Sequence, residues 1–259
     1  MNIFISNDDG IESNGLKALV KQFNKENDLL VVAPEGNRSV CSHSMTLHKP
    51  VYLRKSNVIS ECEAYTVSGL PVDCVKMLAH KFTEFKPDVV ISGINKAHNV
   101  GPDIFYSGTV AIAYEAAFFG HIAFAFSAYS LGESPFELYS IYAEKIVKAL
   151  LKYSEKGTIW NVNFPDVDKT IQGVKITKLG SRTYDDAYEQ VEEDGYVLKS
   201  KYVTLTDEVP DKCSSFLNDN DKDNDIYWID KGYITITPLL FDKTNYEKIK
   251  EIENLCIKL

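Results

Sequence analysis

The adjacent carboxylates Asp8 and Asp9 are the feature of this sequence best suited to chemistry. They follow the short apolar run of residues 2–6, at the point where a buried strand would meet a loop. Two neighbouring carboxylates at such a place repel each other unless a positive charge lies beside them. A bound metal ion is one interpretation of the pair, and an aspartate that caps the following helix is the other.

Two further oxygen donors follow later apolar runs. Ser39 comes after the run at 29–34, and Asn95 comes after the run at 87–93. If these runs are parallel strands, their carboxyl ends meet at one edge of the sheet, beside the first strand. Two carboxylates, a hydroxyl and a carboxamide form an all-oxygen ligand set that suits Mg²⁺, Mn²⁺ or Ca²⁺ better than zinc or copper. Taken singly, Ser39 is typical of a turn and Asn95 of loop hydrogen bonding.

A Ser107-Gly108-Thr109 sequence begins a predicted helix at 109–119. It offers free backbone N–H groups and two hydroxyls at the positive helix end, a favourable place for a phosphate. Gly108 would let the backbone approach an anion closely, although an ordinary helix cap has the same pattern. The sequence has neither GxxxxGK[ST] nor GxGxxG, so nucleoside triphosphate hydrolysis and dinucleotide binding lack their usual motifs.

Alternating strands and helices must position these groups. The strand at 2–6, the helix at 14–26 and the strand at 29–34 make the repeating unit of a parallel sheet. The same pattern predicts further strands at 51–54, 63–67, 87–93 and 122–127, and further helices at 71–82, 109–119 and 135–152. The predicted fold class is α/β, with a Rossmann-like three-layer α/β/α core and a mostly parallel sheet.

The pattern changes after residue 157. Strand-like stretches at 158–164, 173–179 and 232–239 are separated by an acidic, low-complexity region. Residues 243–259 show helical spacing and predict a terminal amphipathic helix. We therefore expect a catalytic core at 1–157 and a strand-rich C-terminal extension at 158–259, both within one domain.

Composition limits the classes of function. With a net charge of −9, the chain is unsuited to binding nucleic-acid polymers, since that affinity comes largely from basic residues. Five cysteines without CxxC spacing predict reduced thiols, no disulfides and a cytoplasmic location. The start of the chain lacks a secretory signal pattern. The apolar stretch 110–131 is divided by Glu115 and by Gly120-His121, so no membrane segment is expected.

Several motifs in order resemble the SurE family of metal-dependent phosphatases. They are SNDDG (6–10), VVAPEGNRS (31–39), PVDCV (71–75), PDVVISGIN (87–95) and NVGPDIFYSGTVAIAYEA (99–116). The resemblance covers nearly all of residues 1–127 and continues weakly through 232–239. Several motifs at family-like spacing are far more specific than any one of them.

The resemblance implies that the chain hydrolyses nucleoside 5′- and 3′-monophosphates with one divalent ion, Mg²⁺ or Mn²⁺. It also implies a homodimer or homotetramer in which the C-terminal extension is exchanged between subunits. The implied metal ligands are Asp8, Asp9, Ser39 and Asn95. The implied substrate-binding residues are Asn95, Ser107, Gly108 and Thr109, and the catalytic residues are Asp8, Asp9 and Asn95.

The sequence is compatible with three interpretations, two catalytic mechanisms and one binding function. In the first, Asp8 positions or deprotonates an attacking water, or serves as a ligand alone. In the second, Asp8 attacks phosphorus directly, although the Asp-x-Asp spacing expected for that chemistry is missing. The third is a non-catalytic metal or nucleotide sensor on the same fold.

Three positions depart from the family pattern. Val40 stands where a glycine usually follows the Asn-Arg-Ser run, and Gly36 replaces a common arginine. Leu70 replaces the threonine of a more usual Gly-Thr-Pro. None of these changes removes a proposed ligand, but each can alter loop shape or substrate preference.

Other residues near the predicted ligands or in the acidic region also have ordinary interpretations. The stretch 219–225, with Asp230 at the twelfth place, has some oxygens of an EF-hand loop but lacks its central glycine and final glutamate. His43 and His98 could act as acids or contact substrate, or could be surface histidines. Cys41 lies two residues after Ser39, and we expect it to be a packing residue.

Overall fold

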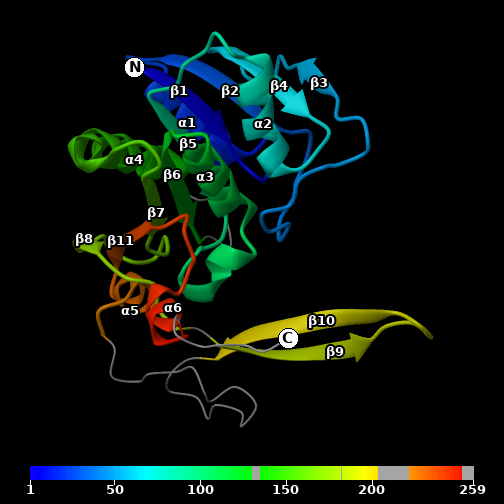
Figure 1. Ribbon diagram of the computed structural model, residues 1–259, viewed down its shortest axis with the longest axis vertical. Coiled ribbons are helices and arrows are strands. Elements are labelled where there is room, and N and C mark those ends of the chain that lie inside the picture. The colour runs from blue at the N-terminus through cyan, green and yellow to red at the C-terminus, as the bar shows by residue number, and fades with distance from the viewer. Residues whose placement is uncertain (130–134, 182, 204–221, 253–259) are drawn as a thin grey trace.

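A nine-stranded, mostly parallel sheet forms the centre of the protein (Figure 1). The structure is a computed structural model that describes residues 1–129, 135–181, 183–203 and 222–252. The strand order is β3-β4-β2-β1-β5-β6-β7-β11-β8, and among the described strands of this sheet only β3–β4 and β7–β11 pair antiparallel. The strands are β1 (Asn2–Ser6), β2 (Asp28–Pro34), β3 (Leu53–Lys55), β4 (Glu63–Val67), β5 (Val89–Asn95), β6 (Ile122–Ala128), β7 (Ile159–Phe164), β8 (Gly173–Ile176) and β11 (Tyr233–Leu239).

Helices cover both faces of the sheet and complete three layers. One face carries α1 (Asn14–Phe23) and α4 (Phe136–Leu150), and the other carries α2 (Pro71–Lys81) and α3 (Gly108–Phe118). Short 3₁₀ helices occur at η1 (Gly101–Phe105) and η2 (Leu151–Tyr153). The predicted α/β fold class is confirmed.

The burial pattern explains why these segments form their elements. The central strands are buried on both faces, so they read as continuous apolar runs instead of alternating ones. In α1, one face made of Leu16, Leu19, Val20 and Phe23 is buried against the sheet. Helix α3 is buried almost all round, and its alanines allow close approach to α2 and the sheet.

Helix α1 shows that neither carboxylate of the Asp pair is a helix cap. The N-cap is Ser13, whose side chain accepts a hydrogen bond from Leu16 N at 3.3 Å. The capping interpretation of Asp8 or Asp9 is therefore wrong, because the chain makes a separate turn before α1 begins.

Two element bounds differ from the prediction. Helix α1 ends at Phe23 instead of residue 26, and β3 begins at Leu53, two residues later than predicted.

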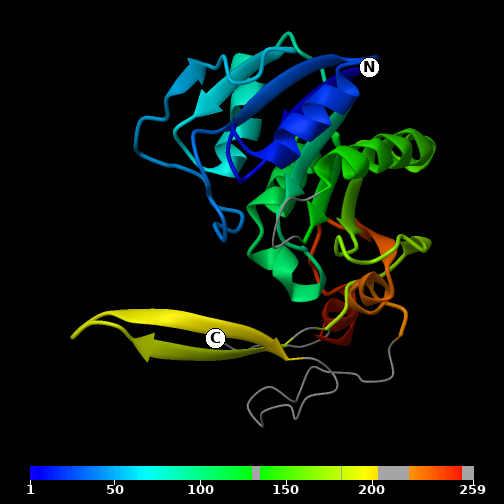
Figure 2. The same ribbon diagram turned by 180° about the vertical axis from the view of Figure 1, so that it is seen from behind.

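The C-terminal part extends the same sheet and adds an arm. Strands β7, β11 and β8 lie at one end of the sheet, so it runs on without a break after residue 157. Strands β9 (Thr183–Gln190) and β10 (Tyr196–Val203) form a separate antiparallel hairpin that stands away from the rest of the protein (Figures 1 and 2). The sequence did not predict this hairpin, because nearly all of its residues with a described burial are exposed and its apolar residues do not alternate cleanly with polar ones.

Two short helices complete the described chain. Helix α5 (Asp225–Asp230) precedes β11, and α6 (Tyr246–Ile252) lies within the predicted terminal helix. The remainder of that prediction, residues 253–259, lies outside the described residues, as does most of the acidic region at 207–225. None of the helices in the described ranges is both long and apolar enough to span a membrane.

Candidate active site

The carboxyl ends of β1, β2 and β5 bring the predicted site residues to one edge of the sheet. Strand β1 lies between β2 and β5, which continue the sheet in opposite directions. A crevice at such a reversal of strand order is where open α/β sheets bind ligands. The start of α3 lies at the same edge, because Thr109 contacts Asp8 there.

A tight turn presents the two carboxylates. The Asn7 side chain accepts a hydrogen bond from Gly10 N at 3.1 Å, and its amide donates to Gly10 O at 3.0 Å and to Ser13 Oγ at 2.7 Å. Gly10 has a φ of +98°, and a Cβ there would lie 2.9 Å from the backbone of Gly36. The turn is therefore locked to α1 and to the loop after β2. Sequence reasoning missed Asn7, although an Asn-x-x-Gly turn pattern is visible.

Asp8 is buried and held by α3. Asp8 is only 4% exposed, and Thr109 Oγ1 donates a hydrogen bond to its Oδ1 atom at 2.5 Å. Burial raises the pKa of Asp8 to about 6; the hydrogen bond from Thr109 opposes that rise and the charge of Asp9 adds to it. A carboxylate with this cost of ionisation is suited to a neighbouring cation.

Asp9 provides the direct test of whether a cation fits here. Its Oδ2 atom is buried and has no hydrogen-bond partner among the described residues. Burial raises the pKa of Asp9, although the charge of Lys96 and a hydrogen bond from the Lys96 backbone oppose the rise. A buried carboxylate oxygen without a partner lowers the stability of the fold. Coordination of a divalent cation by this oxygen would remove that cost. The donor set therefore fits a hard cation.

The other two predicted donors follow β2 and end β5: Ser39 lies in the loop after β2, and Asn95 is the last residue of β5. Ser39 is exposed, and its Oγ donates to Asn37 Oδ1 at 2.5 Å, so its lone pairs stay available. Arg38, the residue before Ser39, donates its N–H to Asp8 O at 2.7 Å. This bond brings the loop after β2 to the end of β1. Asn95 Nδ2 donates to Ala97 O at 2.8 Å, so the amide nitrogen has a partner in the following loop.

The predicted phosphate seat forms the start of α3. Ser107 is its N-cap and accepts a hydrogen bond from Val110 N at 3.1 Å, while Thr109 is fully buried. A Cβ on Gly108 would lie 2.7 Å from Asp8 Cβ and 2.9 Å from Cys41 Sγ. The seat, the first carboxylate and the loop after β2 therefore meet at Gly108, where only a glycine fits without displacement.

The structure gives His43 and His98 partners and shows the surroundings of Cys41. His43 Nε2 lies 2.8 Å from Glu115 Oε2, and His98 Nε2 lies 2.8 Å from Phe164 O with its side chain only 11% exposed. His98 is thus a largely buried histidine at the end of β7, not a surface residue. Burial raises the pKa of Cys41 to about 11, which agrees with a packing role because the thiol stays protonated at neutral pH.

The acidic EF-hand-like stretch has other roles where it is described. Asn224 caps α5 by accepting a hydrogen bond from Tyr227 N at 2.9 Å. Asp225 is fully buried and accepts hydrogen bonds from Gly101 N at 2.9 Å and Gly180 N at 2.7 Å. Asp225 therefore joins the loop before α3 to the C-terminal extension. Residues 219–221 of this stretch lie outside the described residues.

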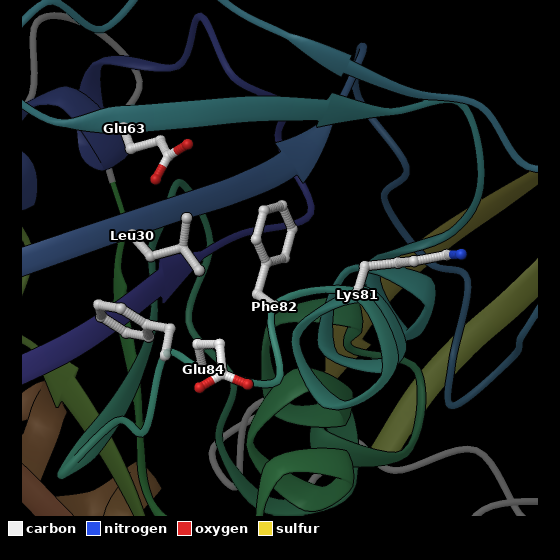
Figure 3. Close-up of a pocket in the computed structure, with 6 residues that line it drawn as sticks. Leu30, Glu63, Lys81, Phe82 and Glu84 are labelled. Carbon is white, nitrogen blue, oxygen red and sulfur yellow. The ribbon is translucent and has the colours of Figure 1, made fainter.

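A separate pocket lies at the opposite edge of the sheet (Figure 3). Its lining residues are Leu30, Glu63, Lys81, Phe82, Glu84 and Phe85. Leu30 and Glu63 are register partners near the amino ends of β2 and β4. This pocket is therefore distant from the carboxyl ends of the strands and shares no residue with the predicted site.

The fold and the site together define a class of protein. It is an α/β protein with two adjacent carboxylates at a strand end, one of which accepts a hydrogen bond from the first turn of a helix. This arrangement is typical of metal-assisted chemistry on a phosphorylated small molecule.

Comparison with known proteins gives the family. The model of the family described as Survival protein SurE matches residues 3–186. A 5′-nucleotidase SurE of Caldanaerobacter subterraneus subsp. tengcongensis is 38% identical over 257 residues, which cover 98% of this chain and 96% of that protein. Another protein of that name, from Clostridium botulinum, is 35% identical over 260 residues. These residues cover 98% of this chain and 99% of that protein. The chain belongs to the SurE family.

A solved structure agrees with this assignment. The crystal structure of the SurE protein from Aquifex aeolicus aligns with a TM-score of 0.78 at 32% sequence identity. The alignment covers 98% of this chain and 99% of that one. The likeness therefore includes the C-terminal extension as well as the core.

Proposed function

We propose that this protein is a divalent-metal-dependent phosphomonoesterase that releases phosphate from nucleoside 5′-monophosphates, and also from 3′-monophosphates. Its near full-length relatives are named 5′-nucleotidases, and the site supplies the groups that such a reaction needs. The observation that carries the proposal is the closeness of Asp8 to Thr109 and Gly108, which supports a phosphate bound at this helix start beside the carboxylate pair.

The proposed metal ligands are Asp8, Asp9, Ser39 and Asn95, and the ion is Mg²⁺ or Mn²⁺. Their oxygens match the preference of these hard cations, and the unpartnered Oδ2 of Asp9 supports a cation at this place. A bound divalent ion supplies neutralisation of phosphate charge and polarisation of the phosphoryl group.

The chain's own groups bind and orient the substrate. The Gly108 N–H at the start of α3 and the Ser107 hydroxyl donate to the phosphate oxygens, favoured by the positive helix end, whereas the Val110 N–H already donates to Ser107 Oγ. The Asn95 amide contributes as charge develops on those oxygens. Asp8, held by Thr109, lies beside the seat and orients the attacking water for in-line displacement of the nucleoside.

Phosphate release from nucleoside monophosphates tests this proposal. We would compare wild type and Asp9→Asn with Mn²⁺, with Mg²⁺ and with a chelator. We expect metal-dependent turnover in the wild type and a loss of about 100-fold or more in the variant, since metal assistance is worth several kcal/mol. Asp28→Asn is the matched control, because Asp28 is exposed at the opposite edge of the sheet. A folded wild type without turnover on any of these substrates contradicts the proposal.

We further propose that the extension at 158–259 mediates a homodimer or homotetramer through the β9–β10 arm. The arm carries exposed apolar side chains, among them Tyr188, which is 71% exposed, and its register partner Leu198, which is 48% exposed. An isolated two-stranded hairpin is marginally stable in water, so a second copy that covers this surface explains the arm.

Sedimentation of a Tyr188→Ser/Leu198→Ser variant tests the role of the arm. The variant keeps the backbone pairing of the hairpin but removes an apolar pair, so we expect a smaller assembly than in the wild type. A wild type that sediments as a monomer, or a variant with unchanged mass, contradicts this proposal.

A reducing cytoplasmic location is proposed because Cys41, Cys62 and Cys74 are all free thiols.

A further inference from the structure

A buried carboxylate lies outside the proposed ligand set, on the helix that begins at the phosphate seat. Glu115 is two helical turns beyond Gly108, and its side chain is 9% exposed. It pairs with His43 Nε2 at 2.8 Å and with Lys76 Nζ at 2.6 Å. Burial opposes ionisation of Glu115, but the hydrogen bonds from His43 and Lys76 outweigh it and hold its pKa below the usual value. The carboxylate is therefore charged and satisfied by partners from two other segments.

One of those partners belongs to the loop that carries Ser39. His43 follows Ser39 by four residues, and Val40 and Ser42 between them have φ values of +56° and +54°. L-residues adopt this left-handed conformation unfavourably, so surrounding contacts must maintain it. The contact of His43 with Glu115 is a side-chain contact that ties this segment directly to α3.

The backbone makes two further contacts on either side of this segment. Arg38 N donates to Asp8 O at 2.7 Å, and Ser42 N donates to Tyr106 O at 3.0 Å. These bonds bring the loop to β1 and to the residue before Ser107, but they leave Ser39 itself exposed. Ser39 also donates its N–H and its hydroxyl to Asn37 Oδ1, at 2.7 Å and 2.5 Å, which are contacts within the loop. The side chain of His43 adds an anchor to α3 on the far side of this loop.

We infer that Glu115 is a positioning residue for the metal site, because it holds His43 and thereby fixes the loop that presents Ser39 to the cation. The inference rests on the proposed role of Ser39 as a metal ligand. Helix α3 carries both Glu115 and the phosphate seat, so this tie sets the place of a metal ligand relative to the bound phosphate. No proton transfer by Glu115 or His43 is involved.

The test is the Mn²⁺ dissociation constant, measured directly from the free Mn²⁺ signal in electron paramagnetic resonance, together with the Mn²⁺ concentration that half-saturates nucleotidase activity. Changes of groups that orient metal ligands typically weaken metal affinity about 10–100-fold. We expect His43→Ala and the isosteric Glu115→Gln to raise the half-saturating Mn²⁺ concentration about tenfold, with a smaller change in kcat at saturating metal. His43→Gln should recover most of the wild-type value, since its amide N–H can still donate to Glu115. Glu137→Gln, which breaks an exposed pair with Lys21, is the control and should leave the value unchanged.

A double-mutant cycle separates positioning from general destabilisation. If His43 acts through Ser39, then Ser39→Ala/His43→Ala should need no more Mn²⁺ than Ser39→Ala alone. Unchanged Mn²⁺ dependence in both His43→Ala and Glu115→Gln overturns the inference, and so do independent effects of Ser39 and His43. In each of these cases the wild type still shows metal-dependent turnover, whereas its absence from the wild type overturns the proposed function instead.

Discussion

Replacement of Gly108 by alanine is expected to damage activity far more than stability. The added Cβ would lie 2.7 Å from Asp8 Cβ and 2.9 Å from Cys41 Sγ, whereas carbon atoms in ordinary contact are about 3.5–4.0 Å apart. Something must therefore move by about 1 Å. Asp8 is held by β1 and Thr109 on one side, and Cys41 belongs to the Ser39 loop on the other. Either movement disturbs a proposed metal ligand.

The magnitudes decide which effect is observed. Overpacking of this kind costs about 1–3 kcal/mol of stability, which is less than the roughly 5–15 kcal/mol that holds a typical domain folded. A displacement of about 1 Å at a reacting group, in contrast, costs about 100-fold in rate. We therefore expect Gly108→Ala to remain folded at 25 °C and to lose about two orders of magnitude in kcat/KM.

The assay combines phosphate release with urea unfolding, and Gly36→Ala is the matched control. Gly36 lies in the same loop as Ser39, but a Cβ there meets no atom within 4 Å. This variant should keep its activity and gain about 0.4–1 kcal/mol of stability, because alanine restricts the unfolded chain. Wild-type kcat/KM in Gly108→Ala would refute the reasoning, since it would mean that Asp8 and the loop can move apart without a loss of activity.

Three further predictions concern stability and its pH dependence. Val40→Gly should raise the free energy of unfolding by about 0.5–1 kcal/mol, because Val40 is 75% exposed with a φ of +56°; a loss in urea unfolding would contradict this. Leu70→Thr should add about 1 kcal/mol in the same assay, because Leu70 is the N-cap of α2 and has no side-chain oxygen; no gain would mean that lost apolar contact outweighs the new cap. In chelator, Asp8 should destabilise the fold as pH rises from about 4 to above 6, because its folded pKa of about 6 exceeds the ordinary aspartate pKa of 3.8. Asp8→Asn should therefore be more stable than wild type by roughly 3 kcal/mol at pH 7, with no advantage near pH 4; an advantage that is independent of pH would exclude Asp8 as its source.

The departures from the family pattern show how sequence and structure complement each other. The sequence alone identifies Val40 and Leu70 as unusual but gives no physical consequence. The backbone places the first in a left-handed conformation and the second at a helix start. Gly36, the third, faces open space, so its effect on the fold is small.

The sequence by itself determined the central elements and indicated which residues make up the candidate site. Apolar runs that end in Asp8-Asp9 and in Asn95 predict buried parallel strands, because such strands are covered on both faces and carry their polar residues at the ends. The Ser107-Gly108-Thr109 helix start was likewise readable, since capping is a local property of the chain.

Only the tertiary structure decided which residues meet. Glu115, His43 and Lys76 lie on three separate segments, and no local pattern links them before the helices pack. The contact of Gly108 with Asp8 and Cys41 depends in the same way on the order of strands in the sheet. The β9–β10 hairpin escaped prediction because periodicity reports burial, and this arm has no buried face within its own chain. Local physics therefore sets the elements, while contacts between distant segments set the geometry of the site.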